Sequence, residues 1–181
     1  SKEFEGYATP EAEFQNRDNR MKSDIDIDAQ TSAAKELKSG TSGYGNMKFM
    51  CPARVTARTE SPDYPVLRLA DMYLGYAEAL CMCSDLDNAL TYLNKIRVRA
   101  GIPEYTFTAT AGKITCPKTQ TDLLNRIRRE RLVELVFEWN RYFDVRRWKV
   151  AEGQNDPEHW IYPAYHTGGE GGKVYGMNMD K

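Results

Sequence analysis

Three glutamates at four-residue spacing are the residues of this chain whose type and spacing could do chemistry. Glu130, Glu134 and Glu138 lie in a stretch, residues 124–148, that is rich in both aromatic and charged side chains. On a helix, residues four apart share one stripe, where like charges repel. Two such carboxylates could act as a general acid and a general base if a cleft held their pKa values apart. Nothing in the sequence specifies a cleft here.

Arginines interleaved with these glutamates favour a structural role instead. A guanidinium group donates hydrogen bonds in a planar fork that matches a carboxylate, and arginines occur three or four positions from each glutamate. We therefore predict an ion-pair network built into a packed interface, with no catalytic residue and no enzymatic activity. The predicted members are Arg126, Glu130, Arg131, Glu134, Glu138 and Arg141.

Four aromatic residues are candidates for ligand binding. Tyr44 lies between two glycines, and Trp160, Tyr162 and Tyr165 lie in a glycine-rich C-terminal stretch. An aromatic ring in a loop can stack on the apolar C–H face of a sugar while its polar edge stays wet. The alternative is that these rings only pack against neighbouring residues.

Other chemistries find little support in the sequence. The net charge of −1 and the acidic residues within the arginine-rich stretch argue against nucleic-acid binding. His159 and His166 have no further ligands at metal-site spacing, so we predict neither a metal nor a cofactor. Cys81 and Cys83 are too close in sequence for half of a zinc site. The cysteines are interpreted as structural or free thiols, with one disulfide left open in an oxidising compartment.

The compartment is not decided by the residues alone. No apolar run approaches the roughly 20 residues of a membrane-spanning helix. The first residues show no signal-peptide pattern. Two interpretations stay open: a cytoplasmic protein, or a mature or clipped piece of an exported one.

The elements that must position these residues are helices. Residues 1–65 are predicted to be irregular, with one short helix near 10–21, extended pieces near 47–57, and a strand or extended loop at 24–28. From residue 66 the apolar spacing predicts an amphipathic helix, then an N-cap at Ser84 or Asp85. A second helix is predicted to end at Gly101, and Pro103 prevents its continuation. The pair resembles a tetratricopeptide hairpin.

A third helix is predicted after a loop at residues 103–118. It should run from about 122 to 138 and continue past a kink near Asn140 to Trp148, with Thr119 and Asp122 as a loose capping box. Residues 66–151 then form a helical scaffold, residues 1–65 pack on it, and residues 152–181 form an aromatic- and glycine-rich loop or tail.

Three sequence blocks together resemble the SusD/RagB family of outer-membrane glycan-binding lipoproteins. They are VLRLADMYLGYAEAL at 66–80, ALTYLNKIRVRAGI at 89–102, and RRERLVELVFEWNRYFDVRRW at 128–148. Their order and spacing are similar to those of the C-terminal half of the family. The resemblance implies a mostly α fold, an α/α superhelix of tetratricopeptide-like hairpins with long irregular loops.

The resemblance also implies a function and a location. Such proteins are found on the extracellular face of the outer membrane of Bacteroidetes. They bind oligosaccharides or polysaccharides without catalysis, for nutrient uptake through a SusC-like TonB-dependent transporter. The chain would be an internal fragment of the C-terminal half, and the parent protein would be held to the membrane only by an N-terminal lipid anchor that this chain lacks. The alternative function is a helical-repeat adaptor that binds proteins or peptides.

Overall fold

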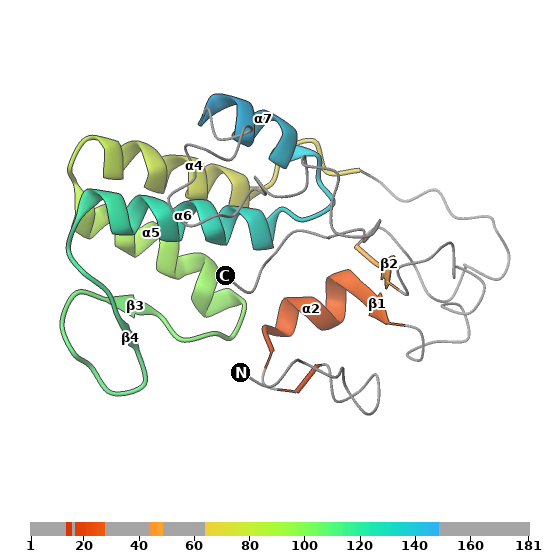
Figure 1. The fold of residues 1–181 in the computed structure, drawn as a ribbon, viewed down its shortest axis with the longest axis horizontal. Helices are drawn as coiled ribbons and strands as arrows, with labels where there is room; N and C mark the ends of the chain where they lie inside the picture. The colour runs from red at the N-terminus through yellow and green to blue at the C-terminus, as the bar shows by residue number, and fades with distance from the viewer. Residues whose placement is uncertain (1–13, 16, 28–43, 49–63, 149–181) are drawn as a thin grey trace, which may run out of the picture. The chain divides into compact units, whose positions relative to one another are not determined.

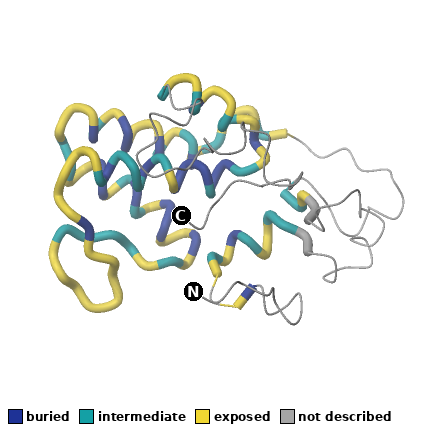
Figure 2. Tube along the Cα trace, viewed as in Figure 1, coloured by how far each residue is buried: buried dark blue, intermediate teal, exposed yellow. Residues whose placement is uncertain are grey.

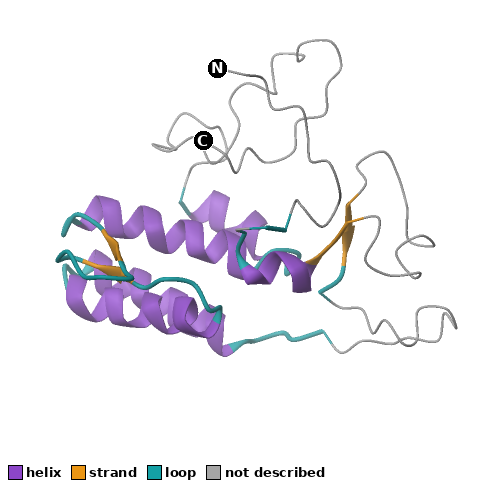
Figure 3. Cartoon of the chain, turned by 90° about the horizontal axis from the view of Figure 1, so that it is seen from below, coloured by secondary structure: helices purple, strands orange, loops and turns teal. Residues whose placement is uncertain are grey.

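Two compact units, residues 1–134 and residues 135–181, make up the chain. The computed structural model describes residues 14, 15, 17–27, 44–48 and 64–148, drawn in colour in Figure 1. The described residues are mostly helical, as predicted from the sequence, and they also contain two short two-stranded sheets (Figure 3). None of their helices is long and apolar enough to cross a membrane.

Three helices form the core of the first unit. Helices α4 (Leu69–Met82) and α5 (Leu86–Arg99) form a hairpin, and α6 (Gln120–Glu134) packs against both (Figure 1). Buried positions lie on the faces by which these helices meet (Figure 2). Alanines on α4 and α5 let the helix axes approach closely. The buried core consists of Ala70, Leu74, Ala77, Cys81, Ala89, Leu90, Leu93, Ile96, Leu123 and Ile127.

A tight turn joins α4 to α5. The Asp85 N–H donates to the Leu80 carbonyl (2.9 Å) and the Ser84 N–H donates to the Cys81 carbonyl (3.0 Å), which is the Schellman pattern at a helix end. Ser84 therefore has a positive φ of 66°. The Asp85 side chain then accepts a hydrogen bond from the Asn88 N–H, so that Asp85 is the N-cap of α5. Asp85, one of the two predicted caps, is thus the residue that begins α5.

The end of α5 follows the sequence prediction. Gly101 has a φ of +69°, the Ile102 N–H donates to the Arg97 carbonyl (3.1 Å), and the Gly101 N–H donates to the Val98 carbonyl (3.0 Å). Glycine adopts this left-handed conformation without steric cost. The Arg97 side chain also donates to the Pro103 carbonyl (2.7 Å), which fixes the chain as it leaves the helix.

Helix α6 begins as predicted but ends four residues early. The Thr119 hydroxyl accepts from the Asp122 N–H (3.3 Å), as in a capping box. The predicted end at residue 138 is wrong, because Phe137 and Trp139 have φ values of 65° and 66°. Bulky residues in the left-handed region interrupt a right-handed helix. Helix α7 (Asn140–Arg147) starts afresh in the second unit.

The short elements differ in detail from the sequence prediction. Among the described residues, the N-terminal helix is α2 (Asn19–Asp24). It begins at Asn19 because the Asp18 side chain caps it by accepting a hydrogen bond from the Arg20 N–H (2.9 Å). Residues 24–28 include a true strand, β1 (Ile25–Ile27), which pairs antiparallel with β2 (Tyr44–Asn46). The predicted 103–118 loop contains a parallel pair, β3 (Tyr105–Thr106) and β4 (Ile114–Thr115).

Candidate functional site

The inner stripe of α6 carries two buried carboxylates. Glu130 and Glu134 are four residues apart on this helix, and only 4% and 2% of their surfaces are exposed. An ionised carboxylate is costly to bury unless cations and hydrogen bonds compensate it. The arrangement of arginines around this pair therefore decides what the pair can do.

Three guanidinium groups converge on Glu134. Its carboxylate accepts from Arg20 Nη1 (3.1 Å), from Arg68 Nη2 (3.0 Å) and from Arg99. The Lys48 ammonium donates to the Glu134 carbonyl oxygen (2.6 Å). Burial by itself raises the pKa of Glu134, but the hydrogen bonds from the three arginines outweigh it and lower this pKa below its ordinary value.

Glu130 is held in a similar way, by two arginines. Arg97 Nη1 donates to its Oε2 (2.8 Å), and Arg20 Nη2 lies 2.7 Å from its Oε1. Arg20 therefore bridges both glutamates, and its other hydrogen bonds go to Asp18 (2.6 Å and 3.0 Å). Burial lowers the pKa of Arg20, while the bonds and charges of Asp18 and Glu130 raise it and prevail.

The described partners of the two glutamates lie far from α6 in sequence. Arg20 lies in α2, Lys48 follows β2, Arg68 precedes α4, and α5 supplies Arg97 and Arg99. We call the group of Arg20, Arg68, Arg97, Arg99, Glu130 and Glu134 the arginine–glutamate cluster. It joins α2, the start of α4, α5 and α6 within the first unit.

Two arginines of α6 that the sequence analysis placed in the network pair with aspartates. Arg126 Nε donates to Asp122 Oδ2 (2.6 Å) and Arg131 Nη1 donates to Asp71 Oδ1 (2.6 Å). Glu138 and Arg141 lie beyond the end of α6, in the second unit, where Glu138 is buried and Arg141 half-buried. Glu138, the third glutamate of the predicted helical stripe, is therefore not on this helix.

The chemistry of the cluster is structural. A carboxylate whose pKa is held low by arginines stays ionised at neutral pH and is a poor proton donor. In the described part of the chain, no three acidic, cysteine or histidine side chains are placed to hold a metal ion. The arrangement is suited to locking distant segments together.

The predicted aromatic ligand contacts fall at the edge of the described structure or beyond it. The Tyr44 backbone lies in strand β2, opposite Ile27. Trp160, Tyr162 and Tyr165 lie outside the described residues. Their role in ligand binding stays a prediction.

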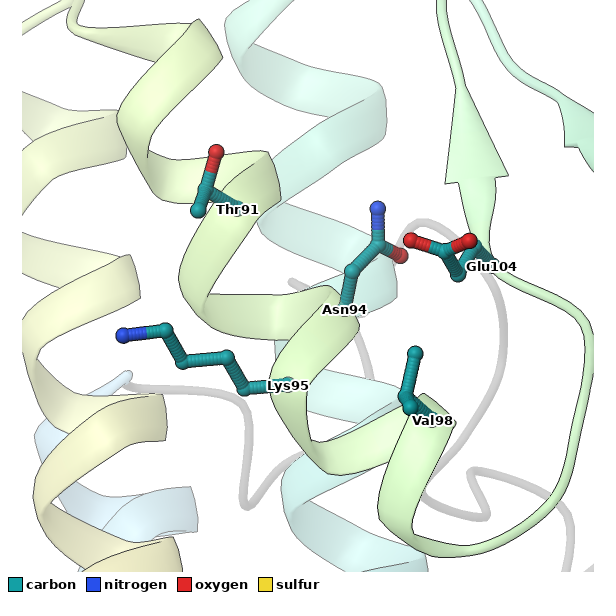
Figure 4. Close-up of a pocket in the computed structure, with 5 residues that line it drawn as sticks. All are labelled: Thr91, Asn94, Lys95, Val98 and Glu104. Carbon is teal, nitrogen blue, oxygen red and sulfur yellow. The ribbon is translucent and has the colours of Figure 1, made fainter.

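An open pocket on the outer face of α5 was missed by sequence reasoning. It has a volume of about 410 Å³ and is lined by Thr91, Asn94, Lys95, Val98 and Glu104 (Figure 4). Four of these residues have the helical spacing i, i+3, i+4 and i+7, on the side of α5 that does not face the core. That spacing could have identified the face, but the position of Glu104 depends on the turn after α5.

A comparison with known families places the chain. A family model described as the SusD family matches residues 2–174. The chain belongs to the SusD family. The SusD/RagB resemblance seen in the three sequence blocks is thereby confirmed.

Two SusD-like relatives show how much of the family this chain contains. The SusD-like protein P2 of Formosa agariphila is 34% identical over 98 residues, which are 52% of this chain and 18% of that protein. A crystal structure of a SusD-like protein from Bacteroides fragilis matches with a TM-score of 0.51 and 32% identity, over 61% of this chain and 20% of that one. The tetratricopeptide-like helical fold is confirmed, and the chain spans about a fifth of the length of these relatives.

Proposed function

We propose that this chain is part of a SusD-like protein that binds oligosaccharides at the outer face of the bacterial outer membrane. The bound glycan passes to a SusC-like TonB-dependent transporter, and the protein makes or breaks no covalent bond in it. The observation that carries this proposal is the match of the SusD family model to residues 2–174.

The arginine–glutamate cluster supports binding over catalysis. Glycoside hydrolysis needs one carboxyl group that is protonated and one that is ionised, on either side of an open substrate site. Glu130 and Glu134 are instead buried together against arginines, and the pKa of Glu134 is lowered. Such a pair suits a rigid scaffold better than a hydrolytic centre.

A thermal-shift screen of this chain against plant, host and microbial oligosaccharides tests the proposal. A ligand at a hundredfold excess over its Kd stabilises the folded state by about 2.7 kcal/mol. We expect a saturable rise in Tm with one class of glycan. A cooperative melt that no glycan shifts would contradict glycan binding by this chain.

One observation favours the second candidate, a helical-repeat adaptor for proteins or peptides. The outer stripe of α4 exposes three apolar side chains, Leu69, Met72 and Tyr76, at spacings of three and four residues. An amphipathic peptide helix docks on such a surface through anchors at the same spacing. Amphipathic peptides therefore belong in the same screen, and a Tm shift with them alone would favour the adaptor.

A further inference from the structure

The pocket on α5 is built from groups that suit a sugar. Figure 4 shows Asn94 and Glu104 directed toward each other across it, with Val98 beneath them and Lys95 extending toward α4. Its volume of about 410 Å³ lies within the range of roughly 300–1,000 Å³ that small-molecule sites occupy. Hydrogen-bonding groups and an exposed apolar side chain thus line one space of ligand size.

Hydrogen bonds hold the far wall of this pocket in place. Asn94 Nδ2 donates to the Tyr105 carbonyl (2.9 Å), and the Tyr105 N–H donates to Asn94 Oδ1 (2.8 Å). The Glu104 carbonyl accepts from the Ile114 N–H (2.8 Å), and its carboxylate pairs with Lys113 (2.8 Å). A preformed wall lowers the entropic cost of binding.

An aromatic cluster adjoins the pocket through Lys95. The Lys95 ammonium lies 4.1 Å from the ring centre of Tyr92 and 4.9 Å from that of Tyr73. Tyr76 packs edge-on against Tyr92 at 4.7 Å and is half exposed. The ammonium is thereby held against these aromatic rings on the α4 side of α5, and Lys95 forms that edge of the pocket.

We propose that this pocket is a subsite for a neutral saccharide, an inference that rests on the proposed function. Sugar hydroxyls donate to the Glu104 carboxylate, and a C–H face of the ring packs on Val98. A carboxylate accepts hydrogen bonds from hydroxyl groups, and a neutral ring brings no charge that Glu104 would repel. An acidic sugar would bring its carboxylate against Glu104, which disfavours it.

Four variants of the chain test the subsite. In Val98→Lys an apolar floor becomes a bulky cation, near the C-terminus of α5, where a positive charge suits the helix dipole. Val66→Lys is the matched control, because Val66 is an equally simple exposed valine, 84% exposed, outside the pocket. Glu104→Gln removes the carboxylate with little change in shape, and Lys118→Ala is a control for loss of an exposed charge.

The measurement is a titration of the labelled chain by ¹⁵N–¹H NMR with maltohexaose, cellohexaose, xylohexaose and mannohexaose, and with trigalacturonic acid as an acidic comparison. We expect saturable shifts at residues 91–98 and 103–106 with a neutral glycan. We expect Val98→Lys and Glu104→Gln to raise Kd about tenfold or more, equivalent to about 1.4 kcal/mol, while both controls leave it unchanged.

Each other result overturns the subsite in a recognisable way. Glycan binding that Val98→Lys and Glu104→Gln do not weaken would remove the subsite and leave the proposed function standing. Binding of trigalacturonic acid alone would overturn the neutral-sugar assignment. No binding of any saccharide by the unaltered chain would overturn the subsite and glycan binding by this chain together. If Val98→Lys fails to fold by circular dichroism, Glu104→Gln decides by the same criterion.

Discussion

Glu134 holds a buried negative charge against Arg20, Arg68 and Arg99. The Glu134→Gln substitution removes this negative charge, so the three guanidinium groups around it lose their ion pairs with residue 134. We expect a decrease in the free energy of unfolding of about 3–5 kcal/mol, measured by urea denaturation. The control is Asp87→Asn, whose pair with Lys118 is exposed and should cost no more than about 1 kcal/mol. Equal effects of the two substitutions would contradict the assigned role of Glu134.

The lowered pKa of Glu134 predicts a dependence of stability on acid. A carboxylate whose pKa is lower in the folded than in the unfolded state stabilises the fold at pH values above the unfolded pKa, here 4.5. This contribution is lost as pH falls below 4.5 through the folded pKa. We expect the stability difference between the unaltered chain and Glu134→Gln to shrink between pH 7 and pH 3. A difference that stays constant over that range would show that Glu134 is not ionised in the fold.

The partners of the glutamates could not be read from spacing. Rules for helical pairs detect residues three or four positions apart, and they found Arg126 and Arg131. Arg20 is 114 positions from Glu134, and Arg68 is 66 positions away. Such pairs arise only when tertiary packing brings separate segments together. The prediction that the three glutamates have a structural role rested on the arginines near them in sequence. Which arginines bind the glutamates depended on the fold.

At the scale of elements, a substitution in the turn between α4 and α5 should stabilise the fold. Ser84 has a φ of 66°, a conformation that costs an L-residue roughly 1–2 kcal/mol, which exceeds the roughly 0.5–1 kcal/mol entropic cost of glycine. We expect Ser84→Gly to raise the free energy of unfolding by about 0.5–1 kcal/mol. A decrease in thermal stability would contradict the assigned turn geometry.

Gly101 provides the reverse control for that experiment. It has a φ of +69°, and a Cβ added there would lie 3.1 Å from Asn19 Nδ2. Gly101→Ala should therefore lower the free energy of unfolding by about 1 kcal/mol or more. The two substitutions are opposite changes at equivalent positions, so their effects should have opposite signs.

Arg20 ties α2 to the helical core. The Arg20→Met substitution removes the ion pairs of Arg20 with Glu130 and Glu134. Glu130 retains its ion pair with Arg97, and Glu134 retains those with Arg68 and Arg99. We expect faster amide hydrogen exchange in residues 17–27 and unchanged protection in α4, α5 and α6, because their apolar core is untouched. The control is Arg126→Met, whose ion pair with Asp122 lies within α6. Unchanged exchange in residues 17–27 would show that other contacts hold α2.

The boundaries of the elements were predictable where local chemistry sets them. Asp85, Gly101 and Thr119 are capping residues that the sequence shows directly, and the structure uses each of them. The early end of α6 was not predictable, because Phe137 and Trp139 adopt left-handed conformations that their side chains disfavour. Only the packing around a residue can impose such a conformation.

At the scale of the whole molecule, family and scaffold were readable in advance. Three blocks of helical sequence indicated the SusD family, and the family match and the mostly helical fold confirm it. The pocket on α5 was not readable, because Glu104 and Asn94 come together only through the turn that Arg97 fixes. In this account, the arginine–glutamate cluster stabilises the scaffold and the ligand is bound elsewhere on its surface.

Equilibrium dialysis of this chain against a mixed pool of neutral and acidic oligosaccharides, with mass spectrometry of both chambers, tests the central claim most directly. One measurement reports which sugars are retained and whether they are cleaved. We predict that neutral oligosaccharides accumulate with the protein, up to one per chain, and are recovered at their original length. Equal concentrations in both chambers, or shortened products, would contradict non-catalytic glycan binding by this chain.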